Sequence, residues 1–342
     1  MNLKQLSETL GLSQTTVSRA LNGYPEVSEK TRERVMRAAK MHNYRPNPRA
    51  KGLATGRAMA IGHIIPVSER LEMVNPIFGD FIAGAGETNV KAGYDMVLSV
   101  VESGAEEQAY RSMKSRGSVD GVVLHGPRMN DPRIPLLDEL GLPFVVHGRA
   151  SGITTPYSWV DVNNRRAFGR ATSFLLDLGH RRIGLINGPE FMDFAHRRRL
   201  GYESALSDRG IPPDLAIMSS GEMTESYGHR SVLNMLAAAD HPTAFMVSSI
   251  IAALGARRAI EETGRTLGRD ISVVTFDDAL SYLRNEGDVP IFTATRSSVH
   301  AAGRAVARML LDKIADPDQP PDPLLLEAEL TIGTSTGPAP RN

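Results

Sequence analysis

Short apolar runs that alternate with helical patterns occupy the chain from residue 60 onward. Most of these runs are continuously apolar, which is the pattern of parallel strands covered on both faces. They span residues 60–65, 96–101, 121–124, 144–146, 183–186, 244–247, 271–276 and 291–295. Helical spacing fills residues 78–92, 165–178, 198–209, 227–239 and 251–263. The alternation predicts an α/β architecture whose eight strands divide between two sheets.

The N-terminal segment has a different pattern, a helix, a turn and a second helix. Gly11 supplies the turn, and apolar residues recur at helical spacing on both sides of it, at Leu3, Leu6, Leu10, Val17 and Leu21. Asn2 and Ser13 are placed to cap the two helices. A third helix is expected from about residue 28 to residue 43. The segment therefore predicts a helix-turn-helix unit.

Charge is distributed unevenly between this segment and the rest of the chain. Residues 1–57 hold 11 Lys and Arg against 4 Asp and Glu, a net charge of +7. The whole chain has 39 of each kind, so residues 58–342 hold 28 against 35, a net charge of −7. A basic module on an acidic body indicates a partner with a phosphate backbone.

Composition excludes several classes of protein. The 342 residues are enough for two or three domains, and they include no cysteine, which excludes disulfides, thiolate catalysis and cysteine-ligated zinc. The chain starts with a polar helix, so we expect no secretory signal, and no apolar run approaches the roughly 20 residues that span a bilayer. We expect a cytoplasmic protein that needs neither cofactor nor metal.

The segment between the headpiece and the body is short and interrupted by prolines. Pro46 and Pro48 break the helical pattern, which leaves residues 47–54 for two helical turns at most. A helix of that length does not form alone in water. We therefore expect a hinge that folds only when something holds it.

Several motifs follow one another along the chain, at residues 15–22, 27–28, 31–32 and 43–47, then 61–62, 75–78, 178–183, 198–202 and 276–278. In this order they resemble the lactose-repressor (LacI) family. The resemblance covers residues 2 to about 335. It implies a DNA-binding headpiece, a hinge helix and a two-lobed core like a periplasmic sugar-binding protein. It also implies a homodimer on a pseudopalindromic double-stranded operator, with a small molecule between the lobes controlling DNA affinity.

The expected domain bounds follow from both arguments. Residues 1–45 form the helix-turn-helix domain, residues 46–57 the hinge, and residues 58–335 the effector-binding and dimerisation domain. The tail, residues 336–342, is rich in small residues and proline, and we expect it to be disordered.

Base recognition is expected from the start of the second helix, which enters the major groove in this kind of unit. Gln14, Thr15 and Arg19 are the candidate base readers, because Gln pairs bidentately with adenine and Arg with guanine. The resemblance places phosphate contacts at short polar residues, for each of which a capping or surface role is equally open: Ser13, Thr16, Ser18, Asn22, Thr31, Tyr44 and Asn47.

Leu53 matches the family's wedge, which enters the minor groove at the operator centre and kinks the duplex. Ala50 and Lys51 would lie beside it in the groove. The alternative is that Leu53 packs only on its dimer mate.

Effector-binding residues are transferred position by position from the family's motifs. Phe78 is the expected apolar wall, and Arg198 the donor that orients hydroxyls or carboxylates. Trp159, the only tryptophan, is expected to stack on a sugar face unless it packs in the core. His147 bonds a hydroxyl or merely caps its strand, with Arg149 as a second donor.

Of the remaining effector positions, one matches the family's pattern and two depart from it. Asp277 is the expected acceptor for a pair of hydroxyls. Ser249 and Ser297 stand where relatives carry larger side chains, and the space this leaves favours a disaccharide over a monosaccharide. Segments 145–149 and 194–195 also resemble the family's α-glucoside regulators.

Two other classes of protein share part of this pattern. A periplasmic binding protein would share the core, but it would need a signal peptide and no basic headpiece. An enzyme on an α/β scaffold would need a catalytic motif, and the sequence has no Gly-x-Gly-x-x-Gly, P-loop, Gly-x-Ser-x-Gly or His-Glu-x-x-His. The leucine repeat that forms tetramers in one branch of the family is also missing, so we expect a dimer.

Overall fold

The structure is a computed structural model, and it describes residues 1–21, 23–44, 56–67, 75–285 and 288–341. The chain forms two compact units, Met1–Met59 and Ala60–Asn342, which are described separately. The predicted hinge lies almost entirely in residues 45–55, outside the described residues. Five of the predicted DNA contacts also lie outside the described residues: Asn22, Asn47, Ala50, Lys51 and Leu53.

The described residues of the first unit form three helices, and the predicted helix-turn-helix is confirmed. They are α1 (Leu3–Leu10), α2 (Gln14–Leu21) and α3 (Glu29–Met41). Asn2 and Gln5 form a reciprocal capping box on α1, and Gly11 ends that helix at φ 61°, a left-handed conformation that glycine adopts without strain. Side chains from all three helices, among them Leu6, Val17 and Val35, make one small core.

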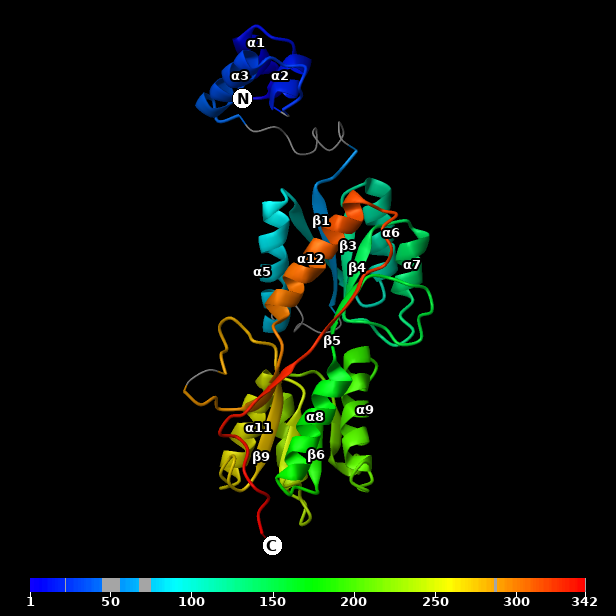
Figure 1. Cartoon of the computed structure of the whole chain (residues 1–342), viewed down its shortest axis with the longest axis vertical. Helices are drawn as coiled ribbons and strands as arrows, with labels where there is room; N and C mark the ends of the chain where they lie inside the picture. Colours follow the sequence, from blue (N-terminus) through cyan, green and yellow to red (C-terminus); the bar gives the residue numbers. More distant parts are fainter. Residues whose placement is uncertain (22, 45–55, 68–74, 286–287, 342) are drawn as a thin grey trace. The chain divides into compact units, whose positions relative to one another are not determined.

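The second unit begins with a parallel sheet that forms the first lobe (Figure 1). Its six strands run in the order β11 (Pro323–Leu326), β5 (Trp159–Val162), β4 (Phe144–His147), β3 (Gly121–His125), β1 (Ala60–Val67) and β2 (Asp95–Glu102). Four helices pack on it: α5 (Pro76–Lys91), α6 (Glu106–Arg116), α7 (Arg133–Glu139) and α12 (Val299–Ala315).

The second lobe repeats this plan. Its strands run in the order β12 (Glu329–Thr331), β10 (Thr293–Arg296), β9 (Ser272–Asp277), β8 (Ala244–Val247), β6 (Ile183–Asn187) and β7 (Met218–Ser220). Only β12 is antiparallel to its neighbour. The lobe's helices are α8 (Asn164–Asp177), α9 (Asp193–Ser207), α10 (Glu225–Leu236) and α11 (Ile250–Glu262), with a 3₁₀ turn at Leu215–Ile217.

The chain crosses between the lobes three times. It passes from β5 to α8, from β10 back to α12, and from β11 to β12. The two-lobed, mainly parallel α/β fold is therefore confirmed. The prediction of eight strands was too low, because the structure has twelve in the described residues. The four that were missed, β5, β7, β11 and β12, are three or four residues long and either partly exposed or polar.

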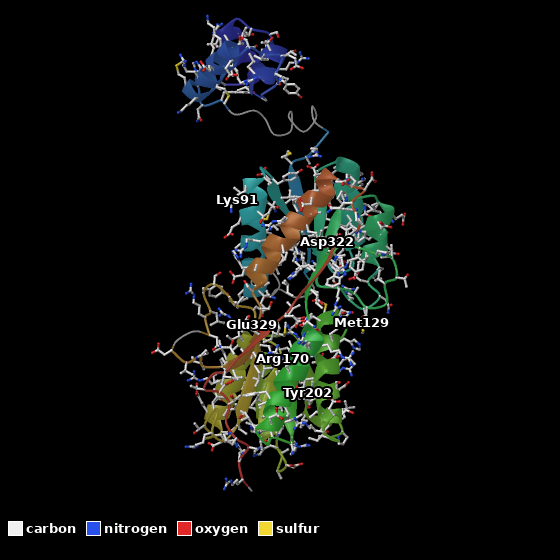
Figure 2. All side chains as sticks on the ribbon, in the orientation of Figure 1. Lys91, Met129, Arg170, Tyr202, Asp322 and Glu329 are labelled. Carbon is white, nitrogen blue, oxygen red and sulfur yellow. The ribbon has the colours of Figure 1, made fainter. Side chains whose placement is uncertain are left out.

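Glycines set the closest helix contacts of the body. The pairs α5–α12, α8–α9 and α10–α11 pack tightly, and Figure 2 labels Arg170 and Tyr202 on α8 and α9. A Cβ added at Gly84 would lie 2.0 Å from the carbonyl oxygen of His300, and one added at Gly201 would lie 2.1 Å from that of Arg165. No larger residue fits these crossings without moving a helix backbone.

The predicted disordered tail is wrong for the residues that the structure describes. Within that segment, the amide of Gly337 donates to Ser272 Oγ at 3.1 Å, and the residue just before the segment, Ser335, is fully buried. Further along, the amide of Ala339 donates to the carbonyl of Leu178 at 2.9 Å. Small residues suit this path because the backbone runs close against β9 and β10, where larger side chains would collide. Of the described helices, none has the length and apolar character needed to cross a membrane.

The glycine crossings give a direct test. Gly84→Ala places its methyl group against the backbone of α12, so we expect the free energy of unfolding to fall by about 1–3 kcal/mol. Gly79→Ala is the matched control on the same helix, since nothing lies within 4 Å of its added Cβ. That variant should gain about 0.5–1 kcal/mol from helix propensity. Urea unfolding of both variants measures the difference, and equal stabilities would contradict this account.

Candidate functional sites

The start of α2 presents polar side chains to solvent. Gln14, Thr15 and Arg19 are all exposed on this helix, so each is free to meet a partner. Ser13 caps the helix by accepting from the amide of Thr16 at 3.0 Å. The exposed face of α2 is polar, and the N-terminus of the helix favours anions. Both features suit a nucleic acid as the partner.

The other predicted headpiece contacts have structural roles as well. Thr31 pairs with the cap Ser28, whose Oγ lies 2.9 Å from Thr31 Oγ1. Tyr44 packs partly buried against the headpiece core. Thr16 and Ser18 are partly buried on α2. A capping or packing role and a phosphate contact are compatible for these four residues.

Between the two lobes of the body lies a cavity of about 250 Å³. Both lobes contribute to its wall, mainly from the carboxyl ends of their strands, which is the usual ligand position in such sheets. The wall includes five of the eight predicted effector residues, Phe78, His147, Arg149, Arg198 and Ser297. A larger hollow of about 660 Å³ lies over α8 and α9, but it is an open surface groove without buried ionisable groups.

Aromatic rings form much of the cavity wall. Phe78 and Phe81 come from α5 in the first lobe, while Phe194 and Phe276 come from the second. Rings on both sides suit a flat ligand with apolar faces, and the polar groups around them would meet its edges.

Three histidines adjoin the rings of the first lobe, and two of them, His125 and His147, line the cavity. His63, His125 and His147 stand on the adjacent strands β1, β3 and β4, and His63 Nδ1 lies 3.0 Å from His125 Nε2. Phe81 stacks on His147 with ring centroids 4.2 Å apart. Burial lowers the pKa of His63 and of His147 to about 4 and lowers the pKa of His125 as well. All three rings are therefore neutral near pH 7.

A buried ion pair marks the first lobe's side of the cavity. Arg149 Nε donates to Asp161 Oδ2 at 2.8 Å, and both residues line the wall. Burial raises the pKa of Asp161 to about 6 in spite of the guanidinium beside it. The pair holds a donor group and an acceptor group next to each other.

Arg198 is the central cation of the second lobe's side. It is 6% exposed, and it donates to Asn164 Oδ1 at 2.8 Å and to the carbonyl oxygen of Ser248 at 2.6 Å. Its guanidinium lies 4.0 Å from the centroid of the Phe276 ring. Burial lowers its pKa to about 10, so it stays charged. These contacts fix the direction of the remaining donors.

Asp278 supplies the acceptor on this side. It lines the cavity, and burial raises the pKa of its carboxyl to about 7, opposed by the charge of Arg198 and reinforced by that of Asp277. Each lobe therefore offers one arginine and one aspartate, so that both walls hold a donor group and an acceptor group. The arrangement suits an uncharged ligand with several hydroxyl groups.

Asp277, the predicted acceptor for a pair of hydroxyls, does not line the cavity. It is 2% exposed, accepts from the amide of Ala279 at 2.8 Å, and lies 3.7 Å from the guanidinium of Arg296. Successive side chains at a strand end point to opposite sides, so that Asp278 takes the place expected for Asp277.

Trp159 and Ser249 also lie outside the cavity wall. Trp159 stands behind Arg149, whose guanidinium lies 5.2 Å from the ring centroid, and it lines a separate surface hollow. Ser249 is fully buried and caps α11 by accepting from the amide of Ile251 at 3.2 Å. Trp159 begins β5, so the residues nearer the strand's carboxyl end reach the cavity instead.

Sequence reasoning missed several residues of the wall, among them Phe81, His125, Asp161, Asn164, Phe194 and Asp278. Asp161 and Asn164 follow Trp159 within one short strand and the start of a helix, so recognising β5 would have found them. His125 directly follows a predicted apolar run. No group of three or more His, Asp or Glu side chains within the described residues is arranged to hold a metal ion.

A headpiece with an exposed helix-turn-helix face and a body with a ligand-sized cavity between parallel sheets define the class of DNA-binding regulators with a periplasmic-binding-protein core. Comparison with known proteins agrees. Residues 3–47 match the family of bacterial regulatory proteins called lacI, and residues 172–336 match the periplasmic binding protein-like domain. The chain belongs to the LacI family and is a transcriptional regulator, not an enzyme.

Individual relatives cover nearly the whole chain. The transcriptional regulator AglR of Rhizobium meliloti (strain 1021) is 45% identical over 340 residues, 99% of this chain and 95% of that protein. CelR of Thermobifida fusca is 32% identical over 97% of both chains. Among solved structures, the lac repressor dimer bound to operator and the anti-inducer ONPF has a TM-score of 0.84 at 27% identity, covering 98% of this chain and 99% of that one. The CelR–cellobiose complex has a TM-score of 0.72 at 31% identity and the same coverage.

Proposed function

We propose that this protein is a homodimeric repressor that binds a pseudopalindromic operator and is controlled by a sugar, specifically an α-glucoside, bound between the lobes of its body. One observation carries the sugar: the cavity combines aromatic faces with an arginine and an aspartate from each lobe. Ring faces pack on the C–H surface of a sugar, and the charged groups bond its hydroxyls.

The proposed size is that of a disaccharide. The two polar sets, Arg149 with Asp161 and Arg198 with Asp278, belong to different lobes, so a ligand with two hydroxylated rings can engage both. The CelR complex contains the disaccharide cellobiose. The α-glucoside assignment rests on the likeness of segments 145–149 and 194–195 to α-glucoside regulators of the family.

Operator recognition is assigned to α2 and the hinge. Gln14, Thr15 and Arg19 would read bases, while the hinge, residues 46–57, would fold on the operator and insert Leu53 into the minor groove. The headpiece charge of +7 supports attraction to DNA and predicts binding that weakens steeply with salt. A protein that acts on the chromosome works in the cytoplasm. The relative CytR of Escherichia coli (strain K12), 28% identical, is named a repressor.

An apolar edge supports the homodimer. β2 is the last strand of its sheet, and its side chains Leu98 and Val100 are 45% and 52% exposed. Val90 on the adjoining helix α5 is 75% exposed. An uncovered apolar edge strand invites pairing with a second chain. The lac repressor structure in the comparison is a dimer.

The central test selects operator sequences from random duplex DNA with the purified protein, then repeats the gel-shift titration with maltose, trehalose, sucrose, cellobiose and glucose. We expect a pseudopalindromic site whose binding one of the α-glucosides changes at least tenfold, a coupling of about 1.4 kcal/mol. Glucose and cellobiose are the controls for ring number and linkage. A site insensitive to every α-glucoside would contradict the proposed effector, and selection of no common sequence would contradict the proposed operator.

Leu53→Ala tests the wedge. The change leaves both folded units intact but removes the apolar group that would unstack the central base step, so most operator affinity should be lost while the melting temperature of the body stays unchanged. A gel-shift titration on the selected operator measures this. Unchanged affinity would assign Leu53 to packing between hinges instead.

The acidic side of the cavity predicts a pH dependence. Burial raises the pKa of Asp278 to about 7, so the carboxylate that accepts hydroxyl bonds becomes protonated as the pH falls through that value. We expect effector affinity to fall roughly tenfold between about pH 8 and about pH 6. Calorimetry at each pH measures this affinity. In Asp278→Asn the affinity should be weaker and the step near pH 7 should disappear, which leaves only the step of Asp161 near pH 6. An identical pH profile in that variant would rule out Asp278 as the titrating acceptor.

A further inference from the structure

Two helices that line the cavity each carry an aspartate that contacts the opposite lobe. On α9 of the second lobe, Asp193 lies beside Phe194 and one turn before Arg198. On α5 of the first lobe, Asp80 lies beside Phe81. Neither aspartate lines the cavity wall. Both are buried, at 0% and 7% exposure, and a buried carboxylate requires close partners.

Asp193 reaches the first lobe through Ser151. The amide of Ser151 donates to Asp193 Oδ2 at 2.5 Å. Arg197, one turn along α9, donates to Asp193 and also to Ser151 Oγ at 2.9 Å. Ser151 lies two residues after Arg149, which lines the cavity. These contacts therefore tie the segment that carries Arg149 to the second lobe.

The second contact is the reciprocal of the first. Asp80 accepts from both the amide and the hydroxyl of Ser281, each at 2.6 Å. Ser281 belongs to the second lobe and lies three residues after Asp278, the acceptor in the cavity wall. In each case an aspartate beside a cavity phenylalanine holds a serine beside a cavity charge.

Other interlobe contacts lie beside the first of these pairs. Arg128 and Met192 form an antiparallel bridge between the loop after β3 and the loop before α9, and Figure 2 labels the neighbouring Met129 where the first lobe meets the second. The amide of Asp193 also donates to the carbonyl of Pro127 at 3.1 Å. The backbone bonds set the separation of the lobes here, and the side-chain pair fixes their register.

We propose that the contacts Asp193–Ser151 and Asp80–Ser281 hold the two lobes closed, and we call these two contacts latches. They thereby position Arg149 and Asp278 on opposite walls of the cavity. The four residues are positioning residues that do not touch the ligand. When either latch opens, the cavity charge on its loop separates from the opposite wall, so that the site is complete only in the closed form. An effector that engages both walls then favours the closed lobes because it binds that form better.

Pulsed electron–electron double resonance, which measures the distance between two spin labels, tests the latches. It needs neither sugar nor DNA, so its outcome is independent of the proposed function. The chain has no cysteine, so Ser115→Cys on α6 and Ser207→Cys on α9 give one spin label in each lobe. Dilution with unlabelled protein restricts the signal to distances within one chain. We expect one narrow distribution in the parent and longer, broader distributions in Asp80→Ala and Asp193→Ala.

Matched controls lie on the same helices. Glu87→Ala on α5 and Glu203→Ala on α9 each remove a carboxylate whose ion pairs stay within one lobe, and their distributions should match the parent. Should an aspartate variant fail to show a cooperative melt, Ser281→Ala and Ser151→Ala remove only the hydroxyl bonds and should give a smaller shift. Folded latch variants with the parent distribution would overturn the proposal, as would equal shifts in the control variants.

Discussion

Parallel pairing of the strands is the constraint on which the rest of the body depends. A parallel sheet presents all its carboxyl ends at one edge, and the three chain crossings turn the two such edges toward each other. The side chains that follow β4, β5 and β9 meet there without any further instruction in the sequence. The glycine crossings complete this arrangement, because they let α5–α12 and α8–α9 approach closely enough to carry Phe81 and Arg198 to the same cavity.

The sequence predicts the secondary structure well where apolar residues recur at a regular spacing. The continuous apolar runs and the capped helices of the headpiece were recognised because burial on both faces and capping leave clear residue signatures. The sequence predicts the site less well where a shift of one residue along a strand decides which side chain faces the cavity. Asp277 and Asp278 differ by one place along a strand end, and only the backbone direction decides which of them faces the cavity. Trp159 was chosen for its ring, yet its strand directs it behind Arg149.

The cavity concentrates buried charge in a way that a stability argument alone does not explain. Two arginines and two aspartates lie within a wall that also holds neutral histidines and phenylalanines. Burying such groups costs free energy unless each finds partners, and Arg198 meets that cost with an amide, a carbonyl and aromatic faces. Groups kept at this cost, with donors and acceptors left over, are expected at a binding site.

The packing of the C-terminal residues against the second lobe affects how the protein folds during synthesis. Main-chain bonds from Ser335 and Ala339 complete the second lobe, while α12 and β11, both beyond residue 298, complete the first. Neither lobe can therefore finish folding until almost the whole polypeptide has left the ribosome. The headpiece, by contrast, builds its own core from residues no further along the chain than Tyr44. During synthesis a basic DNA-binding unit can thus form well before the body that is to regulate it.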